Sequence, residues 1–199
     1  TPTHSDFGLD GDSTFVKTSG GGENFTSFIE KELIPYIDSL YPTAPYRMLI
    51  GHSFGGLLVV NTLLNHNDLF NSYLAIDPSL WWDNKILLKQ LNEGLKNINL
   101  NNKRLFLAIA NTMPSQMDTF FVNKDTSWTT EHIRTILQFS SIIKSKINNG
   151  LLFSNKYYEQ DDHGSVPLIA TYDALHFFFD FYKLPVEEKL LDSLINTDS

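Results

Sequence analysis

The pentapeptide G-H-S-F-G at 51–55 most constrains what this chain can fold into. It lies between an apolar run at 46–50, which is typical of a strand, and an apolar run at 57–64, which is typical of a helix. A strand that turns at once into a helix needs small residues at the turn, and the glycines supply them. Such a turn holds Ser53 in a strained conformation with its hydroxyl at the carboxyl edge of a sheet. The pattern predicts a nucleophilic serine, and an ordinary N-cap serine is the alternative.

Runs of strand type and of helix type alternate along the 199 residues. Strand-like runs lie at 46–50, 72–76, 105–110 and 151–158, and helical periodicity lies at 24–40, 57–64, 85–95, 130–147 and 166–182. The alternation predicts an α/β fold, with a mostly parallel sheet covered by helices on both faces. We expect one domain over 1–184 and a C-terminal tail or linker over 185–199. Pro35 predicts a kink in the first helix.

Composition excludes several classes of function. The formal net charge is -8 and no basic block is present, so nucleic acid is not expected as a partner. No apolar run reaches the roughly 18 residues that a membrane span needs. The chain contains no cysteine, which excludes disulfides, cysteine nucleophiles and thiolate metal sites.

A general base for Ser53 is expected in a loop that follows a later strand, because a serine hydroxyl needs a neighbour to take its proton. His163 lies directly after the last predicted strand and before the last predicted helix, and Gly164 leaves room for its ring. The other histidines are less apt: His4 is near the N-terminus, His52 adjoins the serine, and His66, His132 and His176 fall within or at the ends of predicted helices.

The acid that would orient His163 is expected after the strand at 105–110, because that loop faces the histidine loop at the carboxyl edge of the sheet. The order serine, acid, histidine is that of the α/β-hydrolase arrangement. Asp118 is the first acidic residue in that loop and is the predicted acid. Asp125 and Glu131 remain alternatives, as does a dyad without a strong acid. The acid would fix the tautomer of His163 and stabilise its imidazolium form.

Several stretches together resemble the putative esterase family of α/β hydrolases, which includes enterochelin (siderophore) esterases and S-formylglutathione hydrolase. They are S-G-G-G-E-N-F at 19–25, E-L-I-P-Y-I at 32–37, G-H-S-F-G-G at 51–56, D-P-S-L-W-W at 77–82 and D-H-G-S at 162–165. The resemblance extends over nearly the whole chain, to about Tyr182. It is specific to the family and not to any one substrate.

The resemblance implies a serine carboxylic-ester hydrolase that acts on a small-molecule ester without a metal or organic cofactor. An acyltransferase with the same site and a non-catalytic binding module on a hydrolase fold are the alternatives. The implied site residues are Ser53 as nucleophile, His163 as general acid and base, the backbone N–H of Phe54 as an oxyanion donor, and His52, Trp81 and Trp82 around the substrate.

One departure from the family concerns the residues before the predicted helix at 24–40. In the family several strands precede this helix, and one of their loops supplies a second oxyanion donor. Here residues 1–23 read as loop. We therefore expect a hydrolase-type sheet truncated at the N-terminus, with an exposed edge through which the chain could self-associate. The family is consistent with a periplasmic or secreted bacterial setting.

Overall fold

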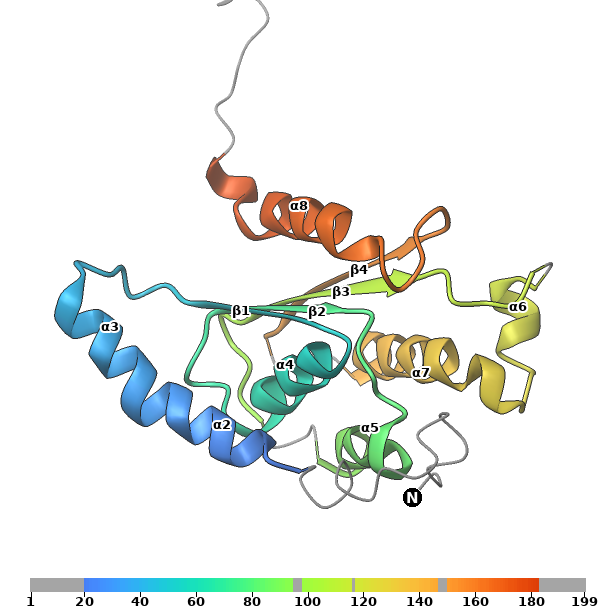
Figure 1. The fold of residues 1–199 in the computed structure, drawn as a ribbon, viewed down its shortest axis with the longest axis horizontal. Coiled ribbons are helices and arrows are strands. Elements are labelled where there is room, and N and C mark those ends of the chain that lie inside the picture. Colours follow the sequence, from blue (N-terminus) through green and yellow to red (C-terminus); the bar gives the residue numbers. More distant parts are fainter. Residues whose placement is uncertain (1–19, 95–97, 116, 147–149, 183–199) are drawn as a thin grey trace, which may run out of the picture.

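Four parallel strands form the sheet at the centre of the fold (Figure 1). The computed structural model describes residues 20–94, 98–115, 117–146 and 150–182. Within them the strands lie side by side in chain order: β1 (Met48–His52), β2 (Ser72–Ile76), β3 (Arg104–Ala110) and β4 (Leu152–Tyr158). Residues 1–19 of the loop predicted over 1–23, and the predicted tail over 185–199, lie outside the described residues, and α2 begins at Gly22 within the predicted loop.

The two central strands are apolar along their whole length because helices cover both faces of the sheet. Every residue of β2 is buried, and so is every residue of β3 after Arg104. Their register places Leu74 beside Phe106 and Ile76 beside Ala108. β1 has no buried residue and forms one edge of this sheet. Self-association through that edge stays a prediction.

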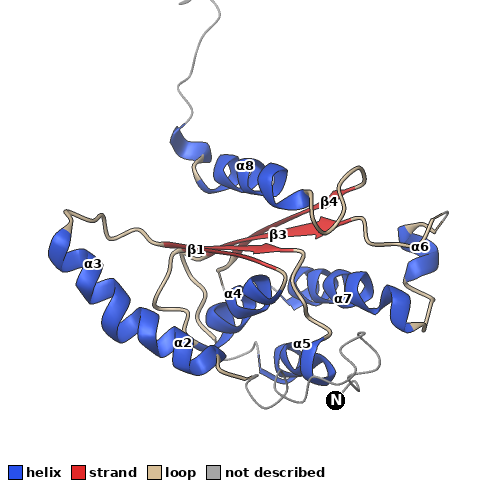
Figure 2. Cartoon of the chain, in the orientation of Figure 1, coloured by secondary structure: helices blue, strands red, loops and turns tan. Residues whose placement is uncertain are grey.

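Helices form a layer on each face of the sheet, as Figure 2 shows. One layer is α8 (Val166–Phe178), and the other contains α4 (Phe54–Asn65), α5 (Trp82–Gly94) and α7 (Glu131–Lys146). Ala170 and Ala174 of α8 are fully buried, and their small side chains let this helix lie close to β2 and β3. The α/β prediction is confirmed. No helix in the described part of the chain has the length and apolar character that crossing a bilayer would require.

The first predicted helix is divided by a π-helical turn. It comprises α2 (Gly22–Phe28), the π segment Ile29–Leu33 and α3 (Ile34–Leu40). Pro35 has no N–H to donate, and its ring crowds the carbonyl one turn earlier. The wider π turn, which ends at Leu33, accommodates the missing N–H and the bulk of the ring. The expected kink is therefore a local change of helix type.

Two elements differ from the pattern of the sequence. A short helix, α6 (Thr119–Val122), lies between the predicted strand at 105–110 and the predicted helix at 130–147, because Asp118 accepts hydrogen bonds from the N–H groups of its first turn. α5 begins at Trp82, but residues 83–85 have positive φ angles of 46°, 52° and 62°, so regular helix starts only after them. Single turns of 3₁₀ helix lie at Trp128–Thr130 and Asp180–Tyr182.

The turn between β1 and α4 is tightly packed around its glycines. A Cβ atom on Gly51 would lie 2.2 Å from the carbonyl oxygen of Gly55, and one on Gly56 would lie 2.9 Å from the Cβ of Pro78. Real Cβ atoms do not approach other atoms so closely. Glycine is thus required at these two positions by space, whereas a Cβ on Gly55 would meet nothing within 4 Å.

We expect Gly51→Ala to destabilise the protein, with Gly55→Ala as its matched control. The new methyl group at Gly51 meets backbone atoms that cannot move aside, and overpacking of this kind costs about 1–3 kcal/mol or more. Each kcal/mol corresponds to about 2–4 °C in Tm for a chain of this size. Thermal unfolding followed by circular dichroism measures the difference. Equal Tm values for the two variants would contradict the packing described for this turn.

Candidate active site

Ser53 occupies the turn between β1 and α4 in a strained backbone conformation, with φ 57° and ψ -116°. Such a conformation costs about 1–3 kcal/mol and persists only where neighbours enforce it. Here the Ser53 N–H donates to the carbonyl of Ile76, and its carbonyl accepts from the N–H groups of Leu57 and Ser79, each at 3.0 Å. These bonds hold the serine at the carboxyl edge of the sheet.

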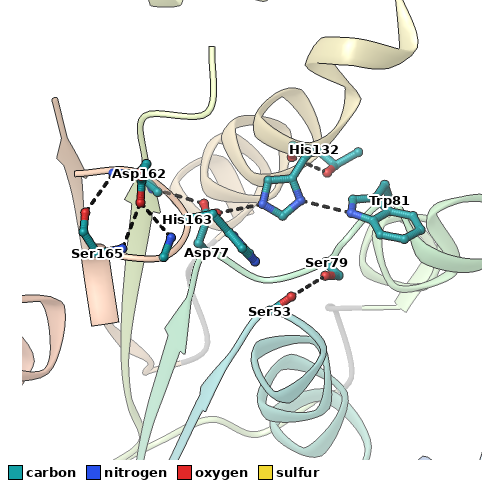
Figure 3. Close-up of polar contacts among 11 residues, drawn as sticks. Ser53, Asp77, Ser79, Trp81, His132, Asp162, His163 and Ser165 are labelled. Atoms are coloured by element: carbon teal, nitrogen blue, oxygen red, sulfur yellow. Dashed lines mark hydrogen bonds and ion pairs between the residues drawn. The ribbon is translucent and has the colours of Figure 1, made fainter. Parts of the chain in front are cut away.

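The side chain of Ser53 points out of the turn toward Ser79 (Figure 3). Its Oγ lies 3.3 Å from the Oγ of Ser79, which is itself buried. Phe54 is the first residue of α4, so its N–H belongs to the turn whose amides have no acceptor within the helix. A helix N-terminus favours negative charge, and here it lies directly beside the serine hydroxyl.

His163 is hydrogen-bonded to Asp77, the first residue after β2. The Nδ1 of His163 lies 2.6 Å from the Oδ2 of Asp77, whose side chain is fully buried. In Figure 3 the ring of His163 extends from Asp77 toward Ser53. The structure therefore brings Ser53 and His163 to the same edge of the sheet, together with a carboxylate that the sequence analysis did not single out.

The prediction of Asp118 as the partner of His163 is wrong in this structure, because Asp118 is engaged elsewhere. Its carboxylate accepts from the two N–H groups at the start of α6. The two alternatives are engaged as well: Asp125 accepts from the hydroxyl of Thr130 at 2.6 Å, and Glu131 forms an ion pair with Lys85 at 3.0 Å.

Asp77 carries a signal that could have identified it. It is a single charged residue at the end of a wholly buried strand, next to the strand that leads into Ser53. It has a positive φ of 39°, its N–H donates to the carbonyl of Ala108 at 2.8 Å, and its Oδ1 accepts from the N–H of Ala110 at 3.1 Å. These two bonds to β3 thus fix the position of Asp77 independently of its contacts with histidines.

A second histidine also contacts Asp77. The Nε2 of His132, in the first turn of α7, lies 2.8 Å from the same Oδ2, and the indole N–H of Trp81 donates to the Nδ1 of His132 at 3.0 Å. This contact was not predicted from the sequence, because His132 falls in a predicted helix and not in a loop after a strand. His52 packs on His163, with ring centroids 4.4 Å apart.

The hydrogen bonds fix the charges at the site. Burial alone would raise the pKa of Asp77, but the bonds from His132 and His163 outweigh it and hold this pKa well below its usual range. The bond to Asp77 raises the pKa of His163 above its ordinary value. Burial, together with the nearby charge of His163, lowers the pKa of His52. Asp77 is therefore ionised and His52 neutral at pH 7.

The ligand atoms of Asp77, His132 and His163 lie within 4.8 Å of one another, which is close enough to surround a metal ion. However, the ring nitrogens that face Asp77 are the ones that carry protons in the hydrogen-bonded arrangement, and a metal would have to displace both protons. The hydrogen bonds account for all three groups, so we interpret the cluster as an acid–base group.

Aromatic side chains lie beside Ser53. The ring of Phe54 is 5.7 Å from that of Trp81 and 5.2 Å from that of Trp82, in edge-to-face geometry. Phe54 and Trp82 also line a groove of about 370 Å³ between α4 and α5. A larger hollow of about 860 Å³ lies along α7 and β4, away from the serine. The smaller groove is thus the one that a molecule held at Ser53 would enter.

Comparison with known proteins places the chain among esterases. The family described as "Putative esterase" matches residues 2–131. Ferri-bacillibactin esterase BesA of Bacillus subtilis is 37% identical over 92 residues, which are 46% of this chain and 32% of that protein. The siderophore enterobactin esterase of Emericella nidulans is 34% identical over 74 residues, which are 36% of this chain and 24% of that protein.

Solved structures give a longer match. The IroE-like serine hydrolase from Shewanella oneidensis superposes with a TM-score of 0.73 at 34% identity, over 87% of this chain and 53% of that one. The chain therefore spans about half of that structure, and its matches cover a third or less of the two curated relatives.

We expect Asp77→Asn to lower the pKa of His163, whereas Asp118→Asn leaves it unchanged. The unchanged protein should titrate above the ordinary histidine value of about 6.5, because ionised Asp77 favours the imidazolium. Asparagine removes that charge at position 77, while at position 118 it remains a good N-cap. NMR titration of the His163 ring protons measures each pKa. The same value in all three proteins would contradict the pairing of His163 with Asp77.

Proposed function

Since the chain belongs to the putative esterase family, we propose that it hydrolyses carboxylic esters through an acyl-enzyme intermediate on Ser53. One observation carries the proposal: the strained serine turn and the hydrogen-bonded pair of His163 and Asp77 lie at the same edge of the sheet. This edge thus combines a hydroxyl, a base of raised pKa and a buried carboxylate, which are the three parts that serine hydrolysis requires.

In the first step Ser53 attacks the ester carbonyl. The hydroxyl turns from Ser79 toward His163, whose Nε2 takes the proton while the Oγ forms a bond to the carbonyl carbon. The carbonyl oxygen becomes negatively charged and is stabilised by the N–H of Phe54 at the start of α4. Asp77 holds the Nδ1–H of His163 and stabilises the imidazolium without accepting its proton.

The second half of the reaction releases both products. The tetrahedral intermediate collapses, the bond to the alcohol oxygen breaks, and His163 gives its proton to the leaving alcohol. His163 then takes a proton from water as the water oxygen attacks the acyl carbon. The bond to the Oγ of Ser53 breaks, the proton returns to this oxygen, and the carboxylic acid leaves.

We propose siderophore esters as the substrate class. The proposal is supported by the names of two relatives, which state ferri-bacillibactin for BesA and the siderophore enterobactin for the Emericella nidulans esterase. It is also supported by the aromatic rings of Phe54, Trp81 and Trp82, which offer flat apolar surfaces beside the serine. Hydrolysis of ferri-bacillibactin compared with a simple aryl ester tests this class, and a preference for the simple ester would contradict it.

The nucleophile is tested with a fluorophosphonate probe and intact-mass measurement. We expect a single adduct on Ser53, none on Ser53→Ala, and labelling of His163→Ala slower by several orders of magnitude because no base takes the proton. Ser39→Ala is the matched control, since its exposed hydroxyl bonds only to the Tyr36 carbonyl in the described structure. Labelling of Ser53→Ala as fast as the unchanged chain would contradict the mechanism, and no adduct on the unchanged chain would favour a non-catalytic module.

The pH dependence of kcat/KM should follow His163. Protonated His163 cannot accept the serine proton, so the rate falls as the pH drops through the pKa of His163, which lies above about 6.5. Asp77→Asn should move this acid-side fall of kcat/KM to lower pH. It should also reduce kcat, by up to about 10⁴-fold if the loss equals that of the same change in a serine protease. Rates on a p-nitrophenyl ester from pH 5 to 9 measure both. An unchanged profile in Asp77→Asn would contradict the role of this carboxylate.

A further inference from the structure

The proposed reaction uses only one of the two histidines that donate to Asp77. His163 and His132 both contact Oδ2, at 2.6 Å and 2.8 Å, while Oδ1 receives the backbone N–H of Ala110. The side chain of His132 is only 21% exposed and that of Asp77 is fully buried, so little water competes for this contact. A second imidazole on the same oxygen as the base needs a physical explanation.

Trp81 determines the protonation of His132. An indole N–H can only donate a hydrogen bond, so the Nδ1 of His132, 3.0 Å away, must accept it with a lone pair. Neutral imidazole then carries its one proton on Nε2, which faces Asp77. A doubly protonated His132 would place an N–H against the indole N–H and lose this bond. The tautomer follows from the donor and acceptor types of the partners.

We propose that His132 is a positioning residue, with its tautomer fixed by Trp81, and that it shares the carboxylate of Asp77 with His163 and thereby sets how strongly Asp77 holds the base. The second N–H fixes the rotation of the carboxylate and draws charge from Oδ2, so the bond to His163 is weaker than it would be alone. The inference deepens the proposed function and rests on it for its kinetic test, whereas its spectroscopic test is independent of activity.

Removal of His132 and removal of the Trp81 donor should have effects of the same direction and different size. Without His132, the charge of Asp77 acts on His163 alone, and the pKa of His163 rises. Without the indole N–H, the Nδ1 of His132 loses the donor that polarises its ring, so its Nε2–H is a weaker donor to Asp77 and the pKa of His163 rises by a smaller amount.

The other titratable groups that face His163 stay in place in both cases. They are His52, which packs on its ring, and Asp162, which accepts from the N–H groups of Gly164 and Ser165. The described hydrogen bonds of Asp162 do not involve Trp81 or His132. The ring of His132 also lies edge-on to that of His163, with centroids 5.2 Å apart, and the phenyl ring of His132→Phe keeps an aromatic ring at that position.

The first test is the ¹⁵N spectrum of the histidine rings in the full 199-residue chain between pH 6 and 8. We expect His132 as the Nε2–H tautomer with an unprotonated Nδ1. A protonated Nδ1 in the unchanged chain would overturn the inference. This spectrum requires neither a folded variant nor a substrate. Its result therefore does not depend on whether the chain hydrolyses esters.

The second test compares three variants by the titration of His163 and the acid limb of kcat/KM. His132→Phe should shift both upward by about half to one pH unit, and Trp81→Phe should shift them upward by a smaller amount. His132→Gln, whose amide can still donate to Asp77, should restore the unchanged values. Loss of kcat in all variants without these shifts would indicate a structural role only and overturn the inference. Shifts of the titration without any esterase activity would leave it standing and reject the proposed function.

Discussion

The burial of the Asp77 carboxylate is the constraint on which the site depends. A charge without contact with water is strongly unfavourable unless hydrogen-bond donors surround it. Here the donors are a backbone amide of β3 and the imidazoles of His132 and His163, from α7 and the loop after β4. One carboxylate at the end of β2 therefore requires three other segments to be correctly placed, and the geometry of the site is a condition for the stability of the fold around it.

Parallel strands concentrate these groups because all of their carboxyl ends lie at one edge of the sheet. Ser53 follows β1, Asp77 follows β2 and His163 follows the last strand. β2 and the residues after it also support the turn at Ser53, since Ile76 and Ser79 bind the backbone of Ser53. Strain at Ser53 is thus maintained by the same segment that carries Asp77, the partner of His163.

The sequence predicted the features that local patterns determine. The glycines around Ser53, the apolar strands and the loop position of His163 each follow from a short stretch of residues. Asp77 and His132 could not be assigned in this way, because their contact depends on how α7 packs beneath the sheet. The loops after β2 and β3 open at the same edge, so chain order could not decide between Asp77 and Asp118. Asp118 satisfied the expected order, yet the nearest amides of α6 bind it.

The order of these residues along the chain has a consequence for synthesis. Ser53 and Asp77 leave the ribosome long before His132, in the crossover between β3 and β4, and His163, in the loop after β4. In the proposed mechanism, the nascent chain during that interval would contain the nucleophile and the carboxylate but no base to take the serine proton. Under that proposal, reactivity would arise only when the C-terminal third has been made and has docked, and an unfinished chain would not attack esters in its surroundings.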